Sequence, residues 1–321
     1  VIPDKYPYSP NSQLLINENG IFVDKTKEIA PQLLQAGLVT GAIFSDYDSD
    51  GDNDLIVSAE WSPIKFYENN DGNFSEAKLE SLKDTEGIWF SVKALDIDND
   101  GDDDYLFGNL GINSKFSAKP GKPFHVFCDD FDENGTYDVV FSKDYKGNLV
   151  PMRGRQCSSE QMPFISEKFE NFISFAEASL DDIIGEDKLS NSLHYEVKDF
   201  HSICLINEGK GKFKKINLPI EAQFSPIMNF TIANINDDTD NEIIAIGNLY
   251  ATEVETARYD ASTGVVLQYK DGKFNVLSSS ETGLSVDGDS KDAKLIEIEN
   301  NKKLFIITNN DAELEVYKLN K

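Results

Sequence analysis

Three short loops concentrate aspartate at a spacing that suits a hard cation. Each loop reads D-x-D-x-[D/N]-G-x-x-D and lies between two apolar runs. Alternate side chains of such a loop point to the inside of one curve, and the glycine permits the reversal. Calcium takes about six to eight oxygen ligands, so clustered carboxylates suit it. The predicted ligands are Asp46, Asp48, Asp50 and Asp54, then Asp96, Asp98, Asp100 and Asp104, then Asp130, Asp132, Asn134 and Asp138.

The alternatives to calcium are weaker. An EF-hand needs a glutamate at the twelfth loop position, where this chain has Val57, Phe107 and Phe141. Magnesium keeps its waters and demands a tighter octahedron. A polar turn without an ion would bring together carboxylates that repel one another. We therefore expect two to four structural calcium ions, the fourth in a weaker loop with Asn234, Asn236, Asp238 and Glu242.

Each loop belongs to a repeat of strand, loop and strand. The clearest copies span 42–58, 92–108 and 126–142, and weaker ones span 231–247 and 295–308. Hairpins with glycine-containing turns alternate with them, as in LLINENGIFVD, IKFYENNDGNFSE, ICLINEGKGKFKK and VLQYKDGKFNV. Roughly four strands per 45 to 50 residues match one propeller blade. The repeat predicts an all-β protein, a single β-propeller domain over 1–321 with five to seven four-stranded blades.

One segment, at about 156–200, departs from this rhythm. Phe169, Phe172, Ile173 and Ala176 have helical spacing, which predicts a helical insertion. Ser166 and Ser179 are the expected N-caps, and Gly185 is the expected C-cap. A shorter helical turn is predicted after Ala30, with proline at its first position and glycine as its stop.

Composition narrows the partners and the location. The chain has 57 acidic and 30 basic residues, a formal charge of -27, so nucleic acid is not an expected partner. Neither is a membrane span expected, because the chain lacks an apolar run of about 18 residues. The start at Val1 fits a mature product or a fragment of a longer exported chain. The three cysteines allow one disulfide with one free thiol, or three buried thiols.

The repeat units, such as AIFSDYDSDGDNDLIVS, resemble FG-GAP or VCBS repeats of the integrin-α-type β-propeller. The stretches 153–164, 225–237 and 255–267 are similar to exported bacterial VCBS-repeat proteins that carry an ASPIC/UnbV-type region, although no such terminal region is visible here. The resemblance implies an extracellular, outer-surface or periplasmic bacterial protein, in many cases lipid-anchored through a preceding part of the chain. It implies the fold more strongly than the function.

The candidate ligand-binding residues are few. The only arginines are Arg153, Arg155 and Arg258, whose planar guanidinium groups suit carboxylate or sulfate. They could instead pair with internal acids such as Asp260. Trp61 and Trp89 are candidates for stacking on sugar rings, with packing in the core as the alternative.

His194 and Tyr195 form the one candidate base and acid pair, as in a polysaccharide lyase. The chain carries no nucleophile elbow, HExxH motif, Walker loop or dinucleotide fingerprint. The sequence thus favours a non-enzymatic binding or adhesion module for a protein or glycan. A lyase acting on an anionic glycan and a purely structural segment of a larger exported protein remain as alternatives.

Overall fold

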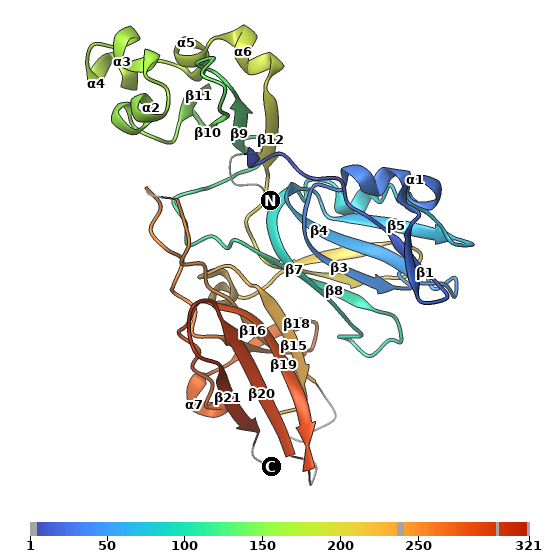
Figure 1. Cartoon of the computed structure of the whole chain (residues 1–321). Coiled ribbons are helices and arrows are strands. Elements are labelled where there is room, and N and C mark those ends of the chain that lie inside the picture. The colour runs from blue at the N-terminus through green and yellow to red at the C-terminus, as the bar shows by residue number, and fades with distance from the viewer. Residues whose placement is uncertain (1–4, 236–240, 254, 300–301, 320–321) are drawn as a thin grey trace.

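Antiparallel sheets dominate the computed structural model, which describes residues 5–235, 241–253, 255–299 and 302–319 (Figure 1). The chain is all-β with several short helices, and none of its sheets is closed among those residues. Figure 1 shows the helices α2 to α6 gathered with strands β9 to β12 in a lobe of their own, apart from the other sheets.

Each of the five predicted repeat units folds as an antiparallel hairpin, which confirms the repeat. In the first three units the aspartate loop joins the two strands, and the last residue of one strand pairs with the first residue of the next. The hairpins are β3 (Leu38–Ser45) with β4 (Asp54–Ser62), β7 (Gly87–Leu95) with β8 (Asp104–Asn109), β9 (Phe124–Asp129) with β10 (Asp138–Tyr145), β15 (Asn229–Ala233) with β16 (Glu242–Ile246), and β19 (Ser290–Ile298) with β20 (Lys302–Asn309).

The four glycine-turn hairpins are confirmed as well. They are β1 (Leu15–Glu18) with β2 (Ile21–Asp24), β5 (Lys65–Asn70) with β6 (Asn73–Glu76), β13 (Ile203–Asn207) with β14 (Phe213–Asn217), and β17 (Val265–Lys270) with β18 (Lys273–Leu277). The remaining strands are β11 (Asn148–Pro151), β12 (Leu193–Val197) and β21 (Glu315–Leu319). These hairpins form two four-stranded runs, β3-β4-β5-β6 and β7-β8-β13-β14, which the pairing of β4 with β7 joins into one eight-stranded sheet. A separate four-stranded run, β15-β16-β17-β18, and the three-stranded sheet β19-β20-β21 follow.

Consecutive runs are linked through their first strands. Strand β3 lies beside β7, β7 beside β15, and β15 beside β19. Hydroxyl groups bridge each step, because Thr40 donates to the carbonyl of Trp89, Ser91 to that of Ile227, and Thr231 to that of Ala293. The buried cores lie between successive runs and are filled by aliphatic and aromatic side chains such as Phe66, Tyr105, Leu106, Leu267 and Phe305.

The segment that interrupts the repeat, called the excursion below, covers residues 109–203 and is longer than the predicted helical insertion at about 156–200. Strand β13 pairs with β8, so the chain between 109 and 203 leaves that run and returns to it. The excursion contains its own sheet, β11-β10-β9-β12, and the third aspartate loop belongs to that sheet. Five short helices cover one face of it: α2 (Arg155–Gln161), α3 (Phe164–Lys168), α4 (Phe172–Ala176), α5 (Leu180–Ile184) and α6 (Glu186–Asn191).

The helix caps agree only in part with expectation. Ser179 caps α5 in a capping box and Gly185 ends that helix, as predicted. Ser166 is wrong as a cap, because it lies inside α3, and Asn171 caps the next helix instead. Phe172 and Ile173 are 64% and 71% exposed, since the segment breaks into separate helices rather than one amphipathic helix.

The other helices are single turns. They are α1 (Thr26–Ile29), η2 (Pro31–Gln35), η3 (Glu80–Leu82), η4 (Ile220–Gln223) and α7 (Ser279–Thr282). The predicted turn after Ala30 is η2, with proline at its start. Within the described ranges no helix has the length and apolar character needed to cross a membrane. All three cysteines are free thiols, with Cys128 and Cys204 buried.

Gly108 tests how closely the second and third runs pack. A Cβ at this position would lie 2.2 Å from the carbonyl oxygen of Ile227. We expect Gly108→Ala to lower the free energy of unfolding by about 1–3 kcal/mol, the usual cost of overpacking. Gly154→Ala is the control, because its Cβ would meet no atom within 4 Å. Equal urea denaturation midpoints for the two variants would contradict the close contact.

Candidate functional site

The three aspartate loops share one pattern of hydrogen bonds. In the first loop, Asp46 accepts from the backbone amides of Asp50 and Gly51 at 3.1 and 3.0 Å. The equivalent pairs recur from Asp96 and from Asp130, with distances of 2.8 to 3.1 Å. Each loop is therefore wound around its first aspartate in the same way.

Two residues of each loop adopt the left-handed backbone conformation. Glycine at the sixth position has φ of 103°, 102° and 90° in the three loops, as its place in the motif predicts. The fourth position also has positive φ, at 63°, 61° and 61°, although it is occupied by Ser49, Asn99 and Glu133. These two left-handed residues turn the side chains at the first, third and fifth loop positions toward one another.

The last carboxylate of each loop is buried and anchors the loop to the sheet. Asp54, Asp104 and Asp138 are 0%, 0% and 2% exposed. In the second loop Asp104 accepts from the amides of Ile97 and Asn207, at 2.9 and 2.7 Å. The first loop repeats this with Tyr47 and Asn69, whereas in the third loop Gln161 replaces the strand amide. This residue thus fixes the loop to the following strand or helix as well as facing the other carboxylates.

Carboxylate oxygens of each loop converge closely enough to hold one ion. Ligand atoms of Asp46, Asp48 and Asp50 lie within 4.8 Å of one another. The same holds for a set in the second loop and a set in the third loop: Asp96, Asp98 and Asp104, then Asp130, Asp132 and Asp138.

Burial, with the neighbouring acids as a smaller cause, raises the pKa of several of these carboxyl groups. Burial raises the pKa of Asp104 to about 7 and that of Asp54 to about 6. Burial, followed by the charge of neighbouring acids, also raises the pKa of Asp48 and Asp98. The loops therefore hold more negative charge than their own amides balance.

Two of the loops contain a further carboxylate, Asp52 or Asp102, at a position that the sequence motif does not include. Within the described part of the chain, Asp52 Oδ1 and Asp102 Oδ1 are buried without a hydrogen-bond partner. Burial and the nearby Asp100 raise the pKa of Asp102 to about 6. An orphaned carboxylate oxygen beside other carboxylates is what a missing cation would leave, so the residues fit calcium. The signal was present in the sequence, since an aspartate directly follows the glycine in these two loops but not in the third.

Part of the predicted fourth site lies outside the described residues, because Asn236 and Asp238 fall there. Glu242 repeats the anchoring role of Asp54 and Asp104. It is fully buried and accepts from the amide of Ile235 at 2.9 Å.

The three arginines do not form one cluster of free guanidinium groups. Arg153 bonds to Gln161 and Glu253, which ties the excursion to the segment after β16. Arg155 donates to the carbonyl oxygens of Phe169 and Ser166 within the helical region. Arg258 is paired with Asp260 at 2.8 Å and lies over the ring of Tyr250. Pairing with an acid, the alternative noted from the sequence, describes Arg153 and Arg258, and the partner of Arg258 is the expected Asp260. Arg155 is instead held by backbone carbonyls.

Trp61 and Trp89 pack inside the protein and offer no open ring for a sugar. They are 5% and 1% exposed. The ring of Trp61 stacks with Phe124 and Phe141, and that of Trp89 packs edge-on against Phe107. Their predicted stacking role is wrong for this reason, and regular alternation does not decide the direction of Trp61, which has a φ of 56° at a bulge of β4.

The side chains of His194 and Tyr195 point away from each other, although both residues border one pocket of about 600 Å³ beside β4. They are neighbours in β12, so their side chains point to opposite faces of the sheet. Tyr195 packs into the apolar cluster around Phe124 and Val197, whereas His194 stacks on Phe127 at 4.2 Å between ring centroids. The predicted base and acid pair is therefore not formed.

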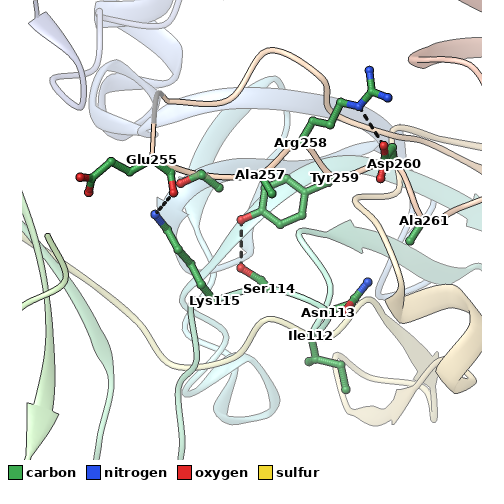
Figure 2. Close-up of a pocket in the computed structure, with 11 residues that line it drawn as sticks. Ile112, Asn113, Ser114, Lys115, Glu255, Ala257, Arg258, Tyr259, Asp260 and Ala261 are labelled. Carbon is green, nitrogen blue, oxygen red and sulfur yellow. Dashed lines mark hydrogen bonds and ion pairs between the residues drawn. The ribbon is translucent and has the colours of Figure 1, made fainter.

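A pocket of about 520 Å³ lies between residues 112–115 and 255–261. Figure 2 shows Tyr259 reaching toward Ser114, to which its hydroxyl is hydrogen-bonded at 2.9 Å, and Lys115 reaching toward Glu255. Arg258 extends from the same segment toward Asp260 (Figure 2). The volume of the pocket is within the usual range for small-ligand sites, about 300–1,000 Å³.

Comparison with known families matches the first two loops. A family model described as an FG-GAP-like repeat covers residues 46–107, from the first aspartate loop to the middle of β8. The match supports an FG-GAP/VCBS-like repeat protein and so confirms the resemblance seen in the sequence. No curated protein matches the chain.

Asp104→Ala tests the anchoring carboxylate. The substitution leaves two buried amides, those of Ile97 and Asn207, without an acceptor. We expect a loss of about 2–5 kcal/mol in the free energy of unfolding. The loss should persist in EDTA, because the anchoring bonds need no ion. Glu170→Ala, at an exposed position, is the control. A loss seen only with calcium present would show that Asp104 acts solely as a metal ligand.

Proposed function

We propose that the chain is a calcium-stabilised, non-enzymatic binding module of an exported protein. The observation that carries this proposal is the carboxylate cage, which recurs in three hairpins with the same hydrogen bonds and, in two of them, an orphaned oxygen. A structural role for the ion is enough to account for the shared geometry of the three loops, without a catalytic reaction at them. Their buried anchors and their places between paired strands suit a structural ion.

The ions would be held by the aspartates at alternate positions of each loop. In the first two loops Asp52 and Asp102 add a further oxygen, whereas the third loop has Thr136, whose hydroxyl and amide bond to Asn134. Bound calcium supplies positive charge that offsets the crowded acids. We therefore expect tighter binding in the first two loops than in the third.

The sheets support a propeller-like arrangement. Three runs of four antiparallel strands and one of three follow one another, with their first strands side by side and their cores between neighbouring runs. This is the pattern of consecutive blades around an axis. We infer an arc of four blades, with the excursion of 109–203 inserted in the second.

Ligand binding is proposed for the pocket of Figure 2. Lys115 and Arg258 border it, and Asn113, Ser114 and Tyr259 add groups that can donate hydrogen bonds. Cationic and neutral donors suit a glycan or protein ligand that carries carboxylate or sulfate groups. Because His194 and Tyr195 lie on opposite faces of β12, the structure offers the lyase alternative no equivalent support.

Calcium should raise the melting temperature. A ligand of the folded state at 100 times its dissociation constant contributes about 2.7 kcal/mol. The wild type should therefore melt lower in EDTA than in calcium, and magnesium should substitute poorly. The Asp48→Asn, Asp98→Asn double variant should lose most of the calcium effect, whereas Asp181→Asn, at an exposed helix position, should keep it. Melting that ignores calcium would contradict the proposal.

Glycan and protein arrays probed with calcium-loaded protein test the binding role. Losing a hydrogen bond to a charged group costs about 1.5–3 kcal/mol, so Arg258→Ala should weaken binding by about tenfold or more. Lys83→Ala, which removes an exposed ion pair with Glu80, is the control. Equal binding by both variants would rule out the pocket, and release of unsaturated uronate, detected by its absorbance, would favour a lyase.

A further inference from the structure

A second kind of metal-ligand cluster lies on the sheet of the excursion. Strands β9 and β12 pair so that Glu196 is directly opposite His125 and His194 is opposite Phe127. Side chains two residues apart in a strand share a face, so His194 and Glu196 lie on the same face as His125. Ligand atoms of these three residues lie within 4.8 Å of one another.

The distances match a shared ion. His125 Nδ1 is 3.0 Å from His194 Nε2 and 3.6 Å from Glu196 Oε1. Ligands at about 2.0–2.2 Å from a zinc ion are separated by about 2.9 to 3.6 Å for angles between a right angle and 120°. The two contacts of His125 Nδ1, the first of which is a hydrogen bond in the absence of an ion, therefore have the spacing of a common coordination sphere, and the third pair of ligand atoms lies within 4.8 Å.

The surroundings hold the imidazoles in place and leave the site accessible. The ring of His194 stacks on Phe127 with an interplanar angle of 1°, and His125 is 7% exposed. His194 is exposed and Glu196 is half-buried, and both lie on β12, the edge strand of this sheet. An ion and a further ligand thus have a path from solvent.

Ser142 provides an independent observation. It pairs with His125 across β9 and β10, and is fully buried. Among the described residues its hydroxyl has no hydrogen-bond partner. Directly opposed side chains lie on the same face of the sheet. A buried hydroxyl beside the imidazoles is suited to a water on the ion, which completes its coordination.

We propose that His125, His194 and Glu196 bind one divalent transition-metal ion such as Zn²⁺. Two imidazoles and one carboxylate with open positions are a donor set for zinc and for other first-row metals. Calcium prefers oxygen ligands throughout, so this site is distinct from the aspartate loops in its ion as well as in its place.

Titration calorimetry with ZnCl₂ in saturating calcium tests the proposal. All proteins should carry Cys157→Ser, because that partly exposed thiol is a competing zinc ligand. The parent should bind one equivalent, and the His125→Ala, His194→Ala double variant should bind at least about 100-fold more weakly. His201→Ala, which removes the third histidine and its pair with Asp199, should bind as the parent does.

Cobalt supplies a second readout that does not depend on how the variants fold. The parent loaded with Co²⁺ should show visible absorption bands that one equivalent of Zn²⁺ removes, and Glu196→Gln should shift them. Calcium-dependent melting should be unchanged in the double variant, since the loops do not use these residues. A parent that binds no zinc equivalent, or a correctly melting double variant that binds zinc as tightly as the parent, would overturn the proposal.

Discussion

Repulsion between carboxylates at the tips of the central hairpins is the constraint on which the structure depends. The first loop has five aspartates and the second has six, and a buried anchoring aspartate holds each loop to the sheet. Asn207 adds to this, since its side chain donates to the backbone of Tyr47 and of Asp103 and so joins the two loops. The same loops that join the strands therefore accumulate negative charge, which the proposed calcium ions would offset.

The repulsion within a loop affects more than the loop itself, because the loops join the paired strands of the sheets. Each loop joins two strands that pair directly, and the first strand of one run packs beside the first strand of the next. A distorted loop would thus disturb both its own hairpin and the neighbouring run. The excursion of 109–203 has its own aspartate loop, with Gln161 of α2 bonded to the anchoring Asp138, so its helices depend on the same device.

The local sequence pattern predicted the hairpins and loops of this arrangement. It did not predict the pairing of strands that are distant in the sequence. The nine hairpins followed from turn residues and alternation, and the loop geometry followed from the aspartate spacing. The return of β13 to β8 is a pairing between distant residues, which no local signal contains. The burial of Trp61 and Trp89 depends on which faces of their strands are covered, whereas the opposite directions of His194 and Tyr195 follow from their being neighbours in one strand. Asp52 and Asp102 were visible in the sequence but lay outside the motif.

A crystal structure of calcium-soaked protein would test the central claim most directly. The account predicts an ion in each of the three loops, bound by oxygens at about 2.3–2.6 Å. In the first two loops, Asp52 and Asp102 should contact the ion or a water bound to it. Ordered loops that contain only water at saturating calcium would contradict the account.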